Sequence, residues 1–423
     1  MLPRGSLIYK MINKKTLDCG ITLVTEKIPE MQAASIGIYV GAGSAYENPE
    51  ISGISHFIEH MFFKGTKNRT YKQIAEQMDN LGAQYNACTS KEYTCFYAKS
   101  IKSSFPKVCD ILFDMLTNSL FDENEMNKER KVIFEEMRMI EDMPEDYIID
   151  LVTENIMHGS DVANSIIGTR KSLKNIGHDE IIQYIKKQYV KDQIVVAVAG
   201  SFNEKELISQ INESFGKFAK KKAARKNILV DGSPRYTSKA RDISQSHIAI
   251  GLPSISMGDK NYYAQAVVND VLGGSMSSRL FQNIREEKGI AYTVYSAPIT
   301  YQNNGMFLIY AAVSLGKEAD AINGISEELK ELEISKEELE NVKQRLKANY
   351  IFSLERLDSR MMRLGKQTLL LDKVYSDAET MKEIDSVSLD DVKLFCDRFS
   401  DITKYSAAII SKNKVNIKGL ING

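Results

Sequence analysis

Several residue types are scarce in this chain, and each scarcity excludes a class of protein. Its 423 residues include five cysteines, an odd number, and no C-x-x-C pair. A disulfide framework and a thiolate metal site are therefore not expected, and we expect the cysteines to be reduced thiols of a cytoplasmic protein. No run of 18 apolar residues occurs, and the first residues lack the charged and apolar segments of a signal peptide. The sequence thus predicts neither a membrane segment nor secretion.

An excess of one charge is also missing. Lysines and arginines number 55, aspartates and glutamates 56, and the formal net charge is −1. This balance provides no basic surface for nucleic acid or for an anionic membrane. Gly273 and Gly274 precede a predicted helix, but no G-x-x-x-x-G-K-[ST] or G-x-G-x-x-G motif lies near them, and we expect no nucleotide site. At 423 residues the chain is long for one core and predicts two or more domains.

Histidines are few as well, yet two of the five lie in the short segment His56-Phe57-Ile58-Glu59-His60. If residues 53–64 form a helix, positions i and i+4 share one face, so both imidazoles reach one metal ion and Glu59 lies beside them. A carboxylate next to a metal-bound water can remove a proton from it, which is hydrolytic chemistry, and the order H-x-x-E-H is that of the inverted zinc motif. The alternative is an ordinary amphipathic helix. Apolar neighbours such as Phe57 and Met61 favour ligands instead, because a buried polar group without a partner is costly.

A catalytic zinc usually takes three protein ligands, so the segment must find a third elsewhere. Residues 124–139 predict a helix whose apolar side is expected to carry Val132, Ile133, Met137 and Ile140. Glu129 and Glu136 are two turns apart and therefore project from one face. Glu136 is the candidate ligand, and Glu129 is a candidate for orienting it or a histidine. A solvated acidic face is the alternative meaning of such a run.

The segment from Gly53 to Thr66, GISHFIEHMFFKGT, resembles the active-site segment of the pitrilysin/insulinase family of zinc metallopeptidases, in particular the mitochondrial processing peptidase β-subunit type and its bacterial relatives. The resemblance extends over nearly the whole chain. It implies one Zn²⁺ per chain, held by His56, His60 and a glutamate 76 residues after His60, which is Glu136 here. It also implies that Glu59 is the general base and that Glu129 matches a second family glutamate. Manganese or cobalt would accept similar ligands.

Residues 82–97 predict two strand pieces joined near Ser90, since they are rich in β-branched and aromatic residues. The resemblance implies that Asn86 and Ala87 lie on an edge strand that aligns an extended peptide substrate by main-chain hydrogen bonds. Without the resemblance, an ordinary core strand is the simpler interpretation.

Arg285 and Tyr292, seven residues apart in the second half, match an arginine and a tyrosine of the family. The arginine would hold a substrate carbonyl or carboxylate, and the tyrosine hydroxyl would donate to the oxyanion of the tetrahedral intermediate. In family members with four such domains, this pair comes from the fourth domain. For a chain with two domains, the resemblance therefore implies a homodimer enclosing a chamber, in which the pair serves the zinc of the partner.

The two halves of the chain follow the same order of predicted strands and helices, which indicates duplicated domains rather than a short repeat. Aligning Gly65 with Gly274 places Gln265, Val268 and Asn269 at the positions of the two histidines and Glu59, so the second half lacks the metal ligands. We expect an α+β fold of two homologous domains, each a mostly antiparallel sheet with helices packed on it. The expected boundaries are 7–218 for the zinc-binding domain, 219–238 for a basic linker and 239–423 for the second domain.

The function predicted from these features is that of a zinc metalloendopeptidase. Its substrates would be peptides or presequence-like extended segments, cut inside a dimeric chamber. A catalytically silent structural or partner subunit of a processing-peptidase-like complex is the alternative, and a heterodimer stays open beside the homodimer.

Overall fold

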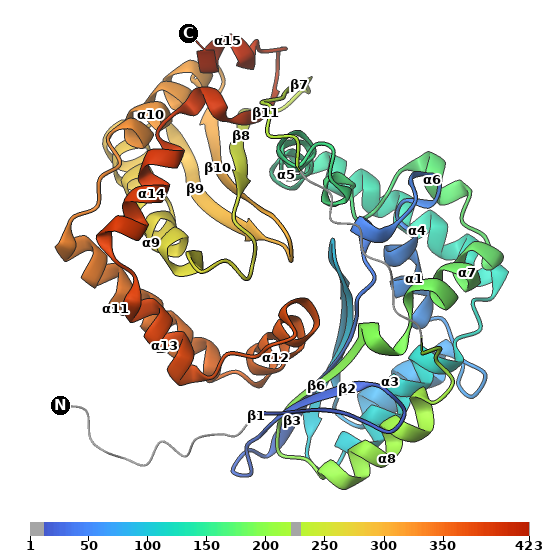
Figure 1. The fold of residues 1–423 in the computed structure, drawn as a ribbon. Helices are drawn as coiled ribbons and strands as arrows, with labels where there is room; N and C mark the ends of the chain where they lie inside the picture. The colour runs from blue at the N-terminus through green and yellow to red at the C-terminus, as the bar shows by residue number, and fades with distance from the viewer. Residues whose placement is uncertain (1–11, 221–229, 423) are drawn as a thin grey trace. The chain divides into compact units, whose positions relative to one another are not determined.

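The computed structural model describes residues 12–220 and 230–422, which form two compact units, each built on one β-sheet (Figure 1). Among the described residues, the first unit comprises 12–134, 166–220 and 351–376, and the second comprises 135–165, 230–350 and 377–422. Helices α4 (Glu123–Asp142) and α11 (Lys336–Leu354) run without interruption past the points at which the chain passes from one unit to the other.

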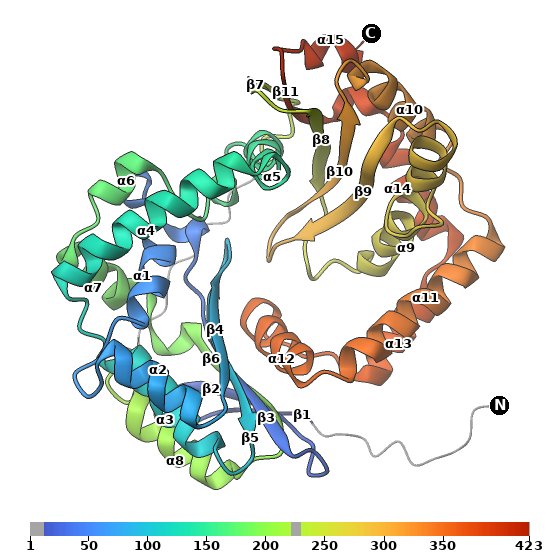
Figure 2. The same ribbon diagram turned by 180° about the vertical axis from the view of Figure 1, so that it is seen from behind.

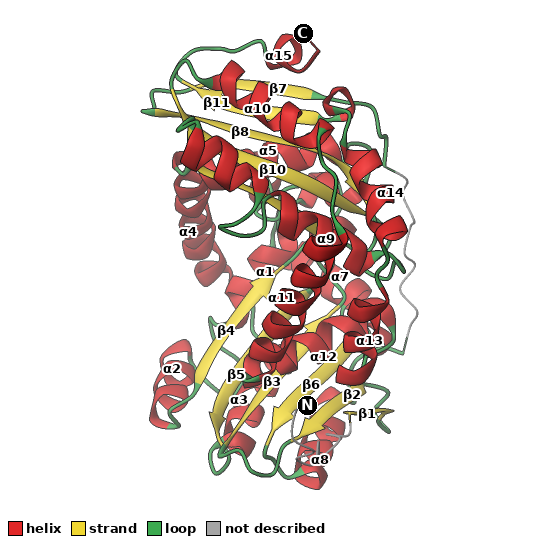
Figure 3. Ribbon diagram, turned by 90° about the vertical axis from the view of Figure 1, so that its left-hand side faces the viewer, coloured by secondary structure: helices red, strands yellow, loops and turns green. Residues whose placement is uncertain are grey.

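Six strands form the sheet of the first unit, in the order β1-β2-β6-β3-β5-β4 (Figure 3). Every neighbouring pair is antiparallel except β2 and β6. The strands are β1 (Ile12–Thr16), β2 (Thr22–Lys27), β3 (Ala33–Val40), β4 (Gln84–Thr89), β5 (Thr94–Ile101) and β6 (Ile194–Gly200). Because β4 pairs only with β5, it forms one edge of the sheet.

Helices cover both faces of this sheet. They are α1 (Ile54–Phe62), α2 (Tyr71–Asn80), α3 (Phe105–Asn118), α6 (Arg170–Lys174), α7 (His178–Gln188), α8 (Glu204–Phe215) and α12 (Leu357–Leu371), beside the first part of α4. On one face, Phe62 of α1 meets Phe96 of β5 with ring centroids 4.9 Å apart. On the other face, α12 packs over β3, β6 and β2, as Figure 3 shows. The approach is close, because a Cβ on Gly365 of α12 would lie 2.1 Å from the Tyr39 ring.

The second unit repeats this topology with five strands, in the order β7-β11-β8-β10-β9 (Figure 2). The strands are β7 (Tyr236–Ala240), β8 (Gln245–Ser254), β9 (Ala291–Thr300), β10 (Gly305–Ser314) and β11 (Ser406–Ser411). The first pair, β7 and β11, is parallel and the others are antiparallel. The order and directions equal those of β2-β6-β3-β5-β4, so the expected α+β fold of two homologous, mostly antiparallel domains is confirmed.

One face of the second sheet is covered by α5 (Pro144–Ile156), whose Asn155 Nδ2 donates to the Ala407 carbonyl of β11 at 2.9 Å. The main core of the unit gathers apolar side chains such as Val267, Ile322 and Phe395. The other helices of this unit are α9 (Tyr262–Leu272), a π-helix (Leu280–Glu287), α10 (Glu318–Lys330), α13 (Asp377–Ser386), α14 (Leu389–Phe399) and α15 (Ile417–Asn422), with most of α11. Each sheet is thus packed against one helix from the opposite half of the chain, α12 for the first and α5 for the second.

Because of this exchange, each compact unit contains residues from both of the expected domains 7–218 and 239–423. Those boundaries along the chain stay a prediction. Residues 221–229 of the expected linker, and the first residues considered for a signal peptide up to residue 11, lie outside the described residues. Within the part of the chain that the structure describes, none of the helices combines the length and the apolar character that crossing a membrane requires.

Candidate metal centre

Helix α1 carries the H-x-x-E-H segment, and its start is fixed by a buried carboxylate. Gly53 precedes the helix with φ 93°, a left-handed conformation that suits glycine. The Glu47 carboxylate accepts hydrogen bonds from the backbone N–H groups of Gly53 at 2.6 Å and Ser55 at 2.8 Å. These bonds satisfy N–H groups that have no partner within the helix. The apolar side chains Ile54, Phe57, Ile58 and Met61 are buried, which leaves the two histidines and Glu59 half-buried along one side.

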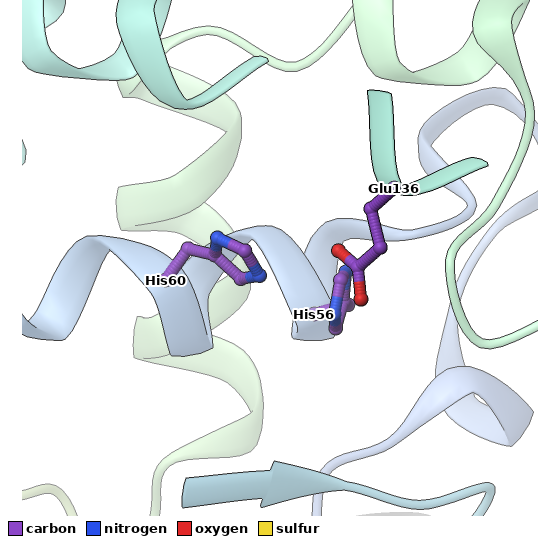
Figure 4. Close-up of side chains that lie close together, drawn as sticks. All are labelled: His56, His60 and Glu136. Carbon is purple, nitrogen blue, oxygen red and sulfur yellow. The ribbon is translucent and has the colours of Figure 1, made fainter. Parts of the chain in front are cut away.

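His56, His60 and Glu136 offer one ligand atom each, and these three atoms lie within 4.8 Å of one another. In Figure 4 the Glu136 carboxylate lies next to the His56 ring, and the His60 ring points toward both. The two imidazole centroids are 4.7 Å apart. Tetrahedral ligands at the usual Zn–N and Zn–O distances lie about 3.4 Å from one another, so small side-chain rotations bring this set around one ion. The three residues therefore fit a zinc ion.

Helix α4 supplies Glu136, and its sequence explains that orientation. Ile133 and Met137 are buried and hold one side of the helix against the protein. Glu136 is half-buried next to that side, while Glu135 is exposed and pairs with Arg138. One expectation for this helix is wrong, because Val132, assigned to the apolar side, is 49% exposed. The buried side of α4 runs through Met126, Ile133 and Met137, and Val132 projects about 100° away from Ile133 around the helix.

The charge state of His56 and the surroundings of His60 suit metal binding. Burial, together with the nearby His60, lowers the pKa of His56 to about 3, so this imidazole is neutral at neutral pH. His60 Nδ1 lies 3.1 Å from Oε2 of Glu129, and Oε1 of Glu129 lies 2.6 Å from the Lys64 ammonium. Burial raises the pKa of Glu129, but these two partners outweigh it and the pKa is lowered. With Nδ1–H donating to a carboxylate, Nε2 of His60 is the nitrogen left for an ion.

Glu59 lies on the same helix between the two histidines and accepts a 2.5 Å hydrogen bond from the Thr89 hydroxyl. Thr89 is the last residue of β4. Thr89 and Glu47 were not predicted, because no local pattern indicates that a hydroxyl in a strand or a carboxylate in a loop bonds to the helix α1.

Asn86 and Ala87 lie on the edge strand β4, opposite Tyr97 and Phe96 of β5. Ser90 N–H donates to the Tyr93 carbonyl in the turn, and hydrogen-bonded pairs alternate along an antiparallel ladder. By this alternation the N–H and C=O groups of Ala87 face away from β5, toward the open edge. The Asn86 side-chain oxygen accepts a 2.8 Å hydrogen bond from the Ala87 N–H.

Arg285 and Tyr292 lie beside each other in the second unit. Arg285 is on the π-helix, and its guanidinium carbon is 4.5 Å from the Phe281 ring centroid and 5.7 Å from that of Tyr292. Tyr292 is the second residue of β9 and is 72% exposed. The wide turn of the π-helix, with Lys288 N–H bonded to the Asn283 carbonyl, is of a kind often found at functional sites.

Comparison with known proteins identifies the family of the chain. Residues 22–170 match the family described as Insulinase (Peptidase family M16), and residues 175–346 match the Peptidase M16 inactive domain. The Bacillus subtilis protein named "Uncharacterized zinc protease YmxG" is 38% identical over 385 residues, 90% of this chain and 94% of its own. The Mycobacterium tuberculosis protein named "Uncharacterized zinc protease Rv2782c" is 33% identical over 405 residues, 94% and 92% of the two chains.

Two solved structures share the fold. A protease from Helicobacter pylori superposes with a TM-score of 0.88 at 20% identity, covering 95% of this chain and all of its own. A chain of complex III from Candida albicans superposes with a TM-score of 0.82 at 18% identity, covering 97% and 99%. Family models, relatives that match over most of their length and shared topology lead to one conclusion: the chain belongs to the insulinase family of peptidases, family M16.

Proposed function

We propose that the chain is a zinc-dependent metalloendopeptidase. The observation that carries this proposal is the convergence of His56, His60 and Glu136 within 4.8 Å, with Glu59 on the same helix as the histidines. Three protein ligands and one open position are the arrangement of a catalytic zinc, and we assign one ion per chain. The names of the Bacillus and Mycobacterium relatives, both called zinc proteases, support the choice of metal.

Each side chain around the proposed ion has a separate role. Bound zinc would polarise a water molecule and lower its pKa toward about 7. Glu59 accepts a proton from the attacking water and returns it to the leaving amine, while the Thr89 hydroxyl holds the carboxylate in position. Glu129 orients the His60 ring through its Nδ1. Lys64, in contact with Glu129, keeps that carboxylate ionised.

The substrate we propose is a peptide or presequence-like segment in an extended conformation, added to the edge of β4. Antiparallel addition of a strand uses the main-chain groups of an edge residue, which suits Ala87. The Asn86 side chain now accepts the Ala87 N–H, so a substrate carbonyl would take its place. Folded proteins are poor substrates in this binding mode, because only an extended chain can pair with the edge strand.

We propose further that two copies form a homodimer enclosing a chamber, with Arg285 and Tyr292 of one protomer acting at the zinc of its partner. Arg285 and Tyr292 support one another through the 5.7 Å contact of guanidinium and ring, and Tyr292 is exposed enough to meet a substrate. Mixing Glu59→Gln chains with Tyr292→Phe chains tests this directly. Recovery of cleavage in a proven mixed dimer is expected, and a mixed dimer as inactive as its parents would contradict it.

Metal analysis with peptide digestion tests the function itself. Wild type should hold about one zinc per chain and cut members of a mixed peptide library, whereas Glu136→Gln should lose metal and cleavage together. Glu135→Gln, one position away and exposed, serves as the matched control and should behave as wild type. A wild type without bound metal and without cleavage would favour the other candidate, a silent subunit. The fold that this chain shares with a chain of complex III supports that alternative.

A further inference from the structure

Two of the five cysteines face each other across the β4–β5 hairpin. Cys88 of β4 and Cys95 of β5 are direct partners in the antiparallel register, so their side chains project from the same face of the sheet. Cys88 is exposed, while Cys95 is 1% exposed. Cys19, Cys109 and Cys396 are buried.

The geometry of this pair suits a covalent link. Directly opposed residues of an antiparallel pair have Cα atoms about 4.5 to 5.5 Å apart, within the range of about 4.4 to 6.8 Å that a disulfide spans. Both side chains leave the sheet on one side, so no strand has to turn over for the sulfur atoms to meet.

The two thiols differ in reactivity. The hydrogen bond from Cys95 lowers the pKa of Cys88, against the effect of its partial burial. Burial raises the pKa of Cys95, and Cys88 raises it further. Cys88 therefore forms a thiolate more readily and is accessible to an oxidant. Cys95 is buried beside it, where its thiol can react with the oxidised sulfur of Cys88.

The pair is next to the residues assigned above to substrate and base. Cys88 lies between Ala87, whose main chain faces the sheet edge, and Thr89, whose hydroxyl holds Glu59. Forming the bond shortens the sulfur contact to about 2.05 Å and draws the two Cβ atoms to about 3.8 Å. Because the Cβ atoms of directly opposed residues lie about 4.5 to 5.5 Å apart, closing this gap draws β4 toward β5 at Cys88 without a change of register, and both neighbours of Cys88 shift with it.

We propose that Cys88 and Cys95 form a reversible disulfide under peroxide, and that this bond slows peptide cleavage by displacing β4. This regulatory part rests on the peptidase function proposed above. The Cys88 thiolate attacks the peroxide O–O bond, giving the sulfenic acid Cys88–SOH, with water as the product once the released hydroxide takes up a proton. Cys95, losing its proton, then attacks the Cys88 sulfur, forms the S–S bond and releases the hydroxyl as a second water. The two thiols lose two electrons, which reduce the peroxide, and a dithiol reductant reverses the change.

The experiment uses the full chain loaded with zinc and treated with increasing hydrogen peroxide. Peptide mapping without reductant should show a Cys88–Cys95 link, and kcat/KM for a test peptide should fall on the order of tenfold and return with dithiothreitol, at constant zinc content. Cys88→Ser should keep its cleavage under peroxide. Cys396→Ser, which retains the pair, should respond as wild type does.

Three results would overturn the proposal: no Cys88–Cys95 link at any peroxide dose, a link that leaves kcat/KM unchanged, or a Cys88→Ser variant that is inhibited as strongly as wild type. The mapped link does not depend on activity. A reduced wild type that cuts no peptide therefore refutes the peptidase function and the regulation built on it, whereas a missing link in an active enzyme refutes the switch alone.

Discussion

The Thr89 hydroxyl donates a 2.5 Å hydrogen bond to Oε2 of Glu59, joining the last residue of β4 to the helix that carries both histidines. A base that shuttles a proton must stay aligned with the attacking water throughout the reaction. The bond also connects the edge strand proposed to hold substrate to the group proposed to act on it. Thr89 is therefore a positioning residue whose effect can be measured.

Thr89→Val should lower kcat about tenfold, because a hydrogen bond to a charged carboxylate contributes about 1.5 kcal/mol and that corresponds to about one decade in rate. Zinc content should stay the same, since Thr89 is not among the residues that offer a ligand atom. Thr89→Ser, which keeps the hydroxyl, should recover most of the rate. Steady-state kinetics of the three proteins check this, and equal kcat values for Val and wild type would remove the positioning role.

Glu129→Gln should weaken zinc binding about 10- to 100-fold, because the carboxylate that accepts from His60 Nδ1 and contacts Lys64 becomes a neutral amide. Competition with a chelator measures the affinity. Glu125→Gln is the control and should bind zinc as wild type does, because Glu125 lies on the same helix with its carboxylate 2.6 Å from the exposed Lys128 ammonium. An unchanged affinity in the Glu129 variant would show that His60 needs no carboxylate to orient it.

Local patterns allowed part of this molecule to be predicted from its sequence. The i, i+4 spacing of His56 and His60 required only a helix, and the helix is there as α1. Glu136 could be named because the family resemblance supplied its distance along the chain. From the residues alone, Glu136 could not be distinguished from an ordinary solvated glutamate, because only the fold brings α4 next to α1.

Long-range packing was beyond such patterns. Nothing in the sequence of α12 indicates that it covers β3 and β6, more than 150 residues away, rather than the sheet of its own half. Thr89 and Glu47 were missed for the same reason, since a hydroxyl in a strand and a carboxylate in a loop look alike whether solvated or bonded. Val132 shows the reverse error, an apolar residue assigned to a core that does not reach it.

Gly365→Ala should destabilise the protein by about 1 to 3 kcal/mol, because the new methyl would lie 2.1 Å from the buried Tyr39 ring and the ring has no room to move. Gly324→Ala on α10 is the matched control. Its methyl would meet only Ile284 at 3.6 Å, an ordinary contact, and the helix should gain up to ~1 kcal/mol. Urea unfolding of both variants measures the difference. Equal effects would mean that α12 does not pack closely on the first sheet.

Glu47 should make stability depend on pH. Burial raises its pKa from 4.5 to about 7, although the N–H groups of Ser55 and Gly53 and the charge of Lys91 act against this. The folded state thus binds the proton more tightly than the unfolded chain. The resulting stabilisation is complete below the unfolded pKa and is lost as pH rises through about 7.

Relative to Glu47→Gln, wild type should therefore lose up to ~3 kcal/mol of unfolding free energy between about pH 4 and pH 8. Comparing the two proteins at each pH cancels the other titrating groups. Denaturant unfolding over that range gives the difference directly. Parallel curves for wild type and variant would show that Glu47 is ionised as easily in the folded protein as in the unfolded chain.

The central claim, that Glu59 acts as the base of a zinc peptidase, is tested most directly by cleavage of one peptide by wild type and by Glu59→Gln, both shown to hold about one zinc per chain. The amide cannot accept the proton from water, so kcat should fall by about 10² to 10⁴ while the metal stays bound. A zinc-loaded Glu59→Gln enzyme that cuts the peptide at the wild-type rate would contradict the claim.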